Sequence, residues 1–237
     1  MKDKQRICVF LQARLDSVRL PNKAVITLAG KTVIEHAMDA LKKVPAGVHA
    51  LLTDAASAPV LSGLAEACGF ELFTGPKEDV LLRFSQAAEF FGADVIVRAT
   101  GDNPLVSREL AELLLDQSRE RGADYGGFLG MPLGLGVEYL SRYALDAAAA
   151  EAADPYEREH VAPFIIRRPA RFHVHEPPAP DEFRHEARVT LDTREDYGFL
   201  SRIFSSLYRG ETIGTAELIT WLKQNTPAPN PDRLCVP

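Results

Sequence analysis

The sequence predicts an α/β protein built on a mainly parallel sheet. Three observations support this prediction. The 237 residues are 46% hydrophobic and 25% charged, which is the composition of an ordinary globular chain. Short runs rich in β-forming residues alternate with longer amphipathic runs, as strands and helices do in this class. This alternation favours parallel strands joined by right-handed crossovers. We therefore treat residues 1–237 as one domain.

The first half of the chain contains the most regular alternation. Strands are expected at 7–11, 49–53, 71–74 and 95–99, and helices at 32–43, 58–68 and 79–91. The helix at 32–43 is the clearest case, because its apolar residues fall on one face: Val33, Ile34, Ala37, Met38 and Leu41. In such a sheet, ligands bind at the carboxyl ends of the strands.

The second half is less regular, above all over residues 126–185. A glycine-rich loop is expected at 126–136, helices at 141–153 and 156–168, and strands at 171–175 and 187–191. The alanine-rich region 141–168 could form a homodimer contact, although ordinary core packing explains its composition equally well. Prolines predict that residues 225–237 form an extended tail.

Composition excludes several classes of protein. A net charge of −6 speaks against a broad nucleic-acid surface. Cys8, Cys68 and Cys235 form no CxxC pair, which argues against a disulfide framework and a zinc site. No run resembles a secretion signal or a membrane span, so we expect a cytoplasmic protein without a membrane partner.

The most informative segment is the loop QARLDSVRLPNK at 12–23, which follows the first expected strand. It brings arginines, a serine and a lysine to a strand end, and these groups suit a polyphosphate. A solvated basic loop is the alternative. The glycines of the dinucleotide-binding and Walker motifs are missing, which disfavours both of those functions.

This loop, extended to QARLDSVRLPNKAV, resembles the signature of the cytidylyltransferases that make CMP-sialate and CMP-KDO, and the spore-coat polysaccharide biosynthesis protein F branch is closest. The resemblance continues through FTGPKEDVLLRF, VRATGDNPLV, GLGVEYLSRYAL, EREHVAPFI and VTLDTREDYGFL. It implies a Rossmann-like three-layer sandwich of the nucleotide-diphospho-sugar transferase type, with a mainly parallel mixed sheet. The implied activity is transfer of CMP from CTP, or of a nucleotide from another triphosphate, to a sugar or sugar acid for surface polysaccharide, with release of pyrophosphate.

The resemblance also assigns residues. The nucleotide-binding positions it implies are Ala13, Arg14, Ser17, Arg19, Lys23, Thr53, Asp54, Gly75 and Arg83. Lys23, Asp102 and Asp192 are the implied catalytic residues, and the two aspartates match the family's Mg²⁺ ligands. Segment 126–185 is the implied sugar side, with Glu138 and His160 as sugar-binding residues.

Other interpretations of these residues remain open. Asp102 and Asp192 could simply cap the helices that follow them, and His160 could be a hydrogen-bonded core residue. The loop also departs from the family pattern, with Asp16 at a position usually held by a small residue and Asn22 in place of a glycine. Two rival functions stay open: a glycosyltransferase with a nucleotide-sugar donor, and a non-catalytic nucleotide-binding module.

Overall fold

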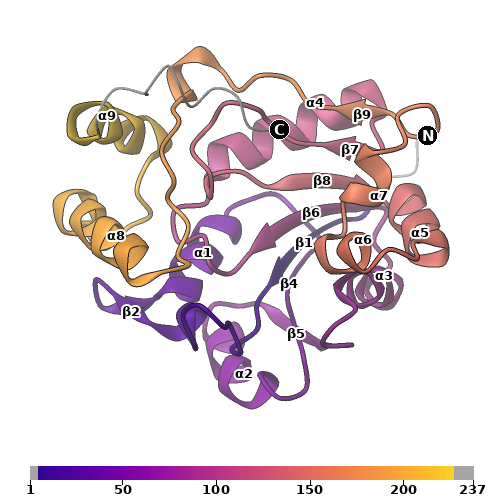
Figure 1. Ribbon diagram of the computed structural model, residues 1–237, viewed down its shortest axis with the longest axis horizontal. Coiled ribbons are helices and arrows are strands. Elements are labelled where there is room, and N and C mark those ends of the chain that lie inside the picture. The colour runs from indigo at the N-terminus through magenta and orange to yellow at the C-terminus, as the bar shows by residue number, and fades with distance from the viewer. Residues whose placement is uncertain (1–4, 227–237) are drawn as a thin grey trace.

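The protein's sheet runs through nearly the whole chain. The structure is a computed structural model that describes residues 5–226. In these residues, seven strands pair in the order β5-β4-β1-β6-β8-β7-β9 (Figure 1). Their bounds are Ile7–Gln12 (β1), Val48–Thr53 (β4), Glu71–Thr74 (β5), Val95–Thr100 (β6), Tyr125–Gly126 (β7), Glu138–Ser141 (β8) and Val174–His175 (β9). A separate hairpin pairs β2 (Thr27–Leu28) with β3 (Lys31–Thr32).

The pairing directions confirm a mixed, mainly parallel sheet. Strands β5, β4, β1 and β6 are parallel to one another, and β9 is parallel to β7. Only β8 runs against its neighbours, β6 and β7. The carboxyl ends of β1, β4 and β6 therefore meet at one edge, which is where a ligand is expected.

Helices cover both faces of this sheet and complete a three-layer arrangement (Figure 1). Along β1, Val9 and Leu11 enter one apolar core while Cys8 and Phe10 enter the other, because successive side chains of a strand point to opposite faces. The first core is closed by α1 (Val33–Leu41), α2 (Ala58–Ala67), α4 (Arg108–Arg121), α8 (Arg194–Leu207) and α9 (Thr215–Asn225). The second is closed by α3 (Val80–Phe91), α5 (Arg142–Glu151) and α7 (Pro163–Ile166). Helix α6 (Pro155–His160) packs against α3.

Two of the predicted elements are wrong. Residues 187–191 form no ladder strand, because Val189 N–H donates to Leu133 O at 2.8 Å and Leu191 N–H to Asp102 O at 2.8 Å, both in loops. The predicted helix 156–168 is broken into α6 and α7 at Val161, whose φ is 71°. Pro163 has no N–H to continue α6, so the helix restarts with that proline in the first turn of α7.

Other differences concern short elements. Strands β7 and β8 and helix α9 were not predicted, and the strand predicted at 171–175 is reduced to β9. The predicted tail at 225–237 lies outside the described residues except for the end of α9 and Thr226. A homodimer contact through 141–168 stays a prediction. Within residues 5–226, no helix has the length and apolarity needed to cross a membrane.

Candidate active site

A cavity of about 420 Å³ opens at the carboxyl ends of β1 and β6. Its polar lining comes from four parts of the chain that are distant in sequence: the loop after β1, the end of β6, the end of α6 and the segment before α8. The side chains in question are Gln12, Arg14, Ser17, Arg19, Lys23, Arg98, Thr100, Asp102, Glu159, His160 and Asp192. The cavity is large enough for a small-molecule ligand.

Close backbone contacts join the end of β1 to both of its neighbours, β6 and β4, beside this cavity. Gly101 N–H donates to Gln12 O at 2.8 Å, and Ala13 N–H donates to Leu52 O at 3.1 Å. A Cβ atom on Gly101 would lie 2.9 Å from the Cβ of Ala13, so only glycine allows the two loops to approach this closely. The buried Ala13 thus joins the phosphate loop, residues 12–23, to the strand end that carries Asp102.

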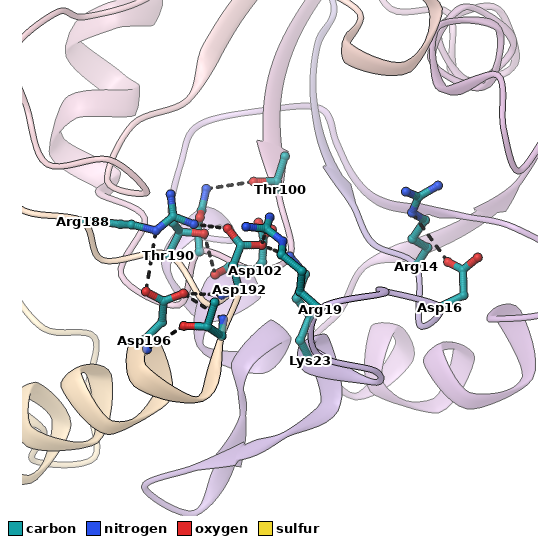
Figure 2. Close-up of polar contacts among 12 residues, drawn as sticks. Arg14, Asp16, Arg19, Lys23, Thr100, Asp102, Arg188, Thr190, Asp192 and Asp196 are labelled. Atoms are coloured by element: carbon teal, nitrogen blue, oxygen red, sulfur yellow. Dashed lines mark hydrogen bonds and ion pairs between the residues drawn. The ribbon is translucent and has the colours of Figure 1, made fainter. Parts of the chain in front are cut away.

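At the centre of the cavity, Lys23 lies between two aspartates (Figure 2). Its Nζ donates to Asp102 Oδ2 at 2.6 Å and to Asp192 Oδ1 at 2.7 Å. The three side chains are 11–23% exposed, so these ion pairs are shielded from solvent but open to the cavity. The three residues that the resemblance predicts to be catalytic therefore lie together.

Asp192 is surrounded by further positive charge. Arg19 Nη2 lies 3.0 Å from Asp192 Oδ1, and Arg188 pairs with Oδ2. Burial alone would raise the pKa of the Asp192 carboxyl, but the hydrogen bond from Lys23 and the charges of the neighbouring cations hold the pKa below its usual value. Asp192 does not cap α8: Thr193 is the N-cap, in a capping box with Asp196.

The other arginine of the loop, Arg14, points to the opposite side of the cavity. It lies 3.4 Å from Glu159 and 3.6 Å from Asp16. Asp16 itself does not line the cavity. Its carboxylate forms an ion pair with Lys77 Nζ at 2.6 Å, and the hydrogen bond from Lys77 lowers the pKa of the Asp16 carboxyl. Figure 2 shows Arg14 and Asp16 set apart from the group around Asp192. The acid in the phosphate loop is thus turned away from the ligand space.

Asn22 also fits the geometry of the loop. Its backbone adopts φ 58° and ψ 21°, in the left-handed region, directly before the short 3-10 helix Lys23–Val25. Asparagine tolerates this conformation better than any residue except glycine. Asparagine can therefore replace the family's glycine here without a change in the backbone conformation that precedes Lys23.

Four of the predicted nucleotide-binding residues do not line the cavity: Thr53, Asp54, Gly75 and Arg83. Asp54 is 2% exposed, and its carboxylate accepts hydrogen bonds from Ala56 N–H, Ser57 N–H and Ser57 Oγ at 2.8–3.0 Å. Ser57 Oγ in turn accepts from Leu15 N–H at 3.1 Å. Asp54 therefore supports the phosphate loop from behind.

Arg83 is fully buried next to Gly75. Its Nη1 donates to Pro76 O at 2.8 Å, and a Cβ on Gly75 would lie 2.8 Å from Arg83 Cγ. Among the described residues, Nε and Nη2 of Arg83 and the buried Thr53 Oγ1 have no hydrogen-bond partner. Burial lowers the pKa of Arg83. Unpaired buried donors of this kind are unusual in proteins. Arg83 and Thr53 have no exposed surface and do not line the cavity.

The two predicted sugar-side residues are in different places. His160 lines the cavity, where its ring lies 4.3 Å from that of Tyr156. Glu138 lies on β8, pairs with Arg98, and lines a second cavity of about 400 Å³. Arg98 and Thr100 line both cavities, so the two adjoin each other at the end of β6.

Sequence reasoning missed several of the lining residues. Arg98 had a signal, because an arginine within the buried strand sequence VIVRAT needs a partner. Glu159 stands next to His160 but looks like any exposed helical acid. Arg188, which does not line the cavity but pairs with Asp192, gave no signal, because this contact depends on the path of the segment before α8.

Asp102 and Asp192 can share one cation, since the Lys23 ammonium already contacts both. No group of three or more His, Cys, Asp or Glu side chains suitable for a metal occurs in residues 5–226. A magnesium ion prefers one or two carboxylates completed by phosphate oxygens and water. The two aspartates therefore fit a magnesium ion that is held jointly with a nucleotide, and they do not form a complete protein cage.

The fold and the site define the class: a nucleotidyltransferase with a Rossmann-like sheet. A family model described as cytidylyltransferase matches residues 8–226, and the chain belongs to this family. It is 30% identical to the spore coat polysaccharide biosynthesis protein SpsF of Bacillus subtilis over 94% of this chain and 96% of the relative. It is 35% identical to the uncharacterized protein MJ1063 of Methanocaldococcus jannaschii over 81% and 80% of the two chains.

The solved structure of a cytidylyltransferase from Leptospira borgpetersenii superposes with a TM-score of 0.87 at 26% identity, covering 94% of this chain and 95% of that one. The family and the branch suggested by the sequence motifs are thereby confirmed.

Proposed function

We propose that the protein transfers CMP from CTP to a hydroxyl group of a sugar and releases pyrophosphate, in the synthesis of a surface polysaccharide. One observation carries the proposal: Lys23, Asp102 and Asp192 meet in a cavity whose other cations are Arg14, Arg19 and Arg98. Family membership supports the cytidylyl group, and the name of the relative SpsF supports the polysaccharide.

In this reaction the sugar oxygen bonds to the α-phosphorus, and the bond between that phosphorus and the β-phosphate oxygen breaks. Lys23 and Arg19 neutralise the charge that builds up on the pyrophosphate, because both reach the cavity centre from the phosphate loop. Arg14 gives up its contact with Glu159 and binds a phosphate oxygen when the nucleotide enters the cavity. The acceptor proton passes to solvent.

Asp102 and Asp192 would hold Mg²⁺ together with the triphosphate. When bound, magnesium supplies charge neutralisation at the phosphates and orients them for in-line displacement. Lys23 contacts both carboxylates in this structure and would contact the phosphates once a nucleotide occupies the cavity. Lys23 would thus have two successive partners.

The test is pyrophosphate release from CTP in the presence of a panel of sugars, with and without Mg²⁺. Asp102→Asn keeps the shape of the side chain and should lower turnover by about 100-fold or more, the size expected for one strong electrostatic contribution. Asp146→Asn is the matched control, because Asp146 pairs with Arg142 on the exposed face of α5, away from the cavity. Full turnover in Asp102→Asn would remove the basis of the proposal.

The same assay separates the rival functions. A glycosyltransferase would consume a nucleotide sugar and release no pyrophosphate from CTP. A non-catalytic module would bind CTP tightly and release none with any sugar.

A further inference from the structure

Helix α6 forms one wall of the active-site cavity. Its last two residues, Glu159 and His160, both line the cavity. Glu159 Oε1 lies 3.4 Å from Arg14 Nη2, so the end of α6 touches the phosphate loop. The position of this short helix therefore decides whether Glu159 and His160 face a bound ligand.

Helix α6 cannot hold this position by itself. It has six residues, and an isolated helix of that length is unstable in water. It ends at Val161, whose φ of 71° and ψ of −61° are unfavourable for a β-branched side chain. Ala162 N–H donates to His160 O at 2.9 Å across this residue, which gives a strained γ-turn. Such strain persists only where surrounding contacts impose it, so other elements fix the end of α6.

Two ion pairs of this segment lead only to the chain just after it. Glu157 is buried and pairs with Arg168 at 3.0 Å. Asp154, the N-cap of α6, pairs with Arg167 at 3.3 Å. Both arginines follow α7 directly, so these contacts set the angle between α6 and α7. They do not reach α3, against which α6 packs.

Arg158 connects α6 to two other helices. Its Nε donates to Asp79 Oδ2 at 2.7 Å, and its Nη2 lies 2.6 Å from the same oxygen. Its Nη1 donates to Ala152 O at 2.8 Å and to Ala149 O at 3.3 Å, at the C-terminal end of α5. The last carbonyls of a helix have no partner within the helix, so the guanidinium caps α5. One side chain of α6 is thus bonded to both α3 and α5.

Asp79 gives this connection a fixed end. It is the N-cap of α3: its Oδ1 accepts a hydrogen bond from Leu82 N–H at 2.9 Å, while its Oδ2 binds Arg158. Val80, the first residue of α3, also lines the cavity. The side chains of Arg158 and Asp79 are 25% and 27% exposed, so their ion pair is partly shielded from solvent. The same carboxylate therefore fixes the start of α3 and the end of α6 at the cavity.

Building on the proposed function, we propose that Arg158 is a positioning residue that binds Asp79 and the end of α5 and thereby holds the end of α6 at the cavity. Arg158 does not line the cavity itself and acts through Glu159 and His160. Glu159 competes with a phosphate for Arg14, so holding Glu159 close lowers the affinity for CTP. His160 is kept at the site of transfer, so the same anchor raises the rate.

The experiment replaces Arg158 with glutamine, which removes the guanidinium contacts. Hydrogen exchange of residues 156–161, followed by mass spectrometry, should become at least tenfold faster. In calorimetry, CTP should bind as tightly as to the parent or more tightly, while kcat for pyrophosphate release with the best sugar of the panel should fall at least tenfold. A general loosening of the fold would instead lower CTP affinity and kcat together and would overturn the inference. Arg142→Gln is the matched control, because Arg142 pairs with Asp146 at 2.7 Å on α5, and it should change none of these values.

Asp79→Asn is the second variant, and it carries the test if Arg158→Gln fails to fold. It keeps the Oδ1 acceptor that caps α3 and removes the charge that binds Arg158. Exchange and kcat should change in the same directions but by less, and the double variant should be no worse than Arg158→Gln alone. Unchanged exchange in Arg158→Gln, or faster exchange with an unchanged kcat, would overturn the inference and leave cytidylyl transfer intact. A parent that releases no pyrophosphate with any sugar would count against the proposed function alone, because exchange and CTP affinity then decide whether Arg158 anchors α6.

Discussion

Replacing Lys23 with methionine tests the centre of the site. The lysine Nζ holds two carboxylates at 2.6 and 2.7 Å, and its side chain is 15% exposed. After the change, Asp192 keeps Arg19 and Arg188 as partners. Asp102 keeps none, because Lys23 is the one cation that pairs with it within residues 5–226. The loss therefore falls mainly on Asp102.

The expected loss in the free energy of unfolding follows from the number of partners that each aspartate keeps. A hydrogen bond between charged groups contributes about 1.5–3 kcal/mol, and only the bond to Asp102 goes without compensation. Lys23→Met should accordingly lower the free energy of unfolding by about 1.5–3 kcal/mol. In the double variant with Asp102→Asn, most of that loss should disappear, since the unpaired charge is gone.

Urea unfolding followed by circular dichroism measures these differences. The control is Lys31→Met, which removes the ion pair between Lys31 and Asp39. This pair has the same length, 2.6 Å, but its two side chains are more exposed, at 40% and 33%. An exposed pair contributes only about 0–1 kcal/mol. Equal losses in the two single variants would refute the argument that Lys23 compensates a partly buried Asp102.

The same variants also test the proposed exchange of cations. In the parent protein the Lys23 ammonium competes with a divalent ion for both aspartates. In Lys23→Met that competitor is absent, so Mg²⁺ should raise the midpoint of unfolding more than it does in the parent. An identical response to Mg²⁺ in both proteins would argue against metal binding between Asp102 and Asp192.

The parts of the site that follow single strands could be predicted from sequence. The phosphate loop and Asp102 come directly after β1 and β6, and parallel neighbouring strands bring their carboxyl ends together. The residue types of the loop also indicated that Lys23 faces a ligand site, because a run of basic groups at a strand end suits a polyphosphate. For these residues, the alternation of strands and helices was sufficient to predict the edge of the sheet at which they lie.

The remaining parts depend on long-range contacts. Lys23 and Asp192 are 169 positions apart, and Asp192 reaches the site through backbone bonds from 189–191 to loops, where the sequence predicted a strand. The pairing of Arg98 with Glu138 requires β8 to lie antiparallel beside β6, and β8 is only four residues long. A short strand after a glycine-rich loop carries too little periodicity to be recognised.

Three more tests concern the loop and its neighbours. The pKa of Asp192 is lowered on folding, so its contribution to stability is present above about pH 4 and is lost as pH falls through the lowered value; Asp192→Asn should make acid unfolding less steep. At Asn22, with φ 58°, Asn22→Gly should be nearly neutral in urea unfolding, whereas the β-branched Asn22→Val should cost about 1–2 kcal/mol. The Asp16–Lys77 ion pair joins the phosphate loop to the loop before α3, although an acid so near a triphosphate ought to repel it. If the pair holds the loop in shape, Asp16→Asn and Lys77→Met should each weaken CTP binding in calorimetry, and the double variant should be no weaker than either. Tighter CTP binding by Asp16→Asn would instead mean that repulsion outweighs positioning.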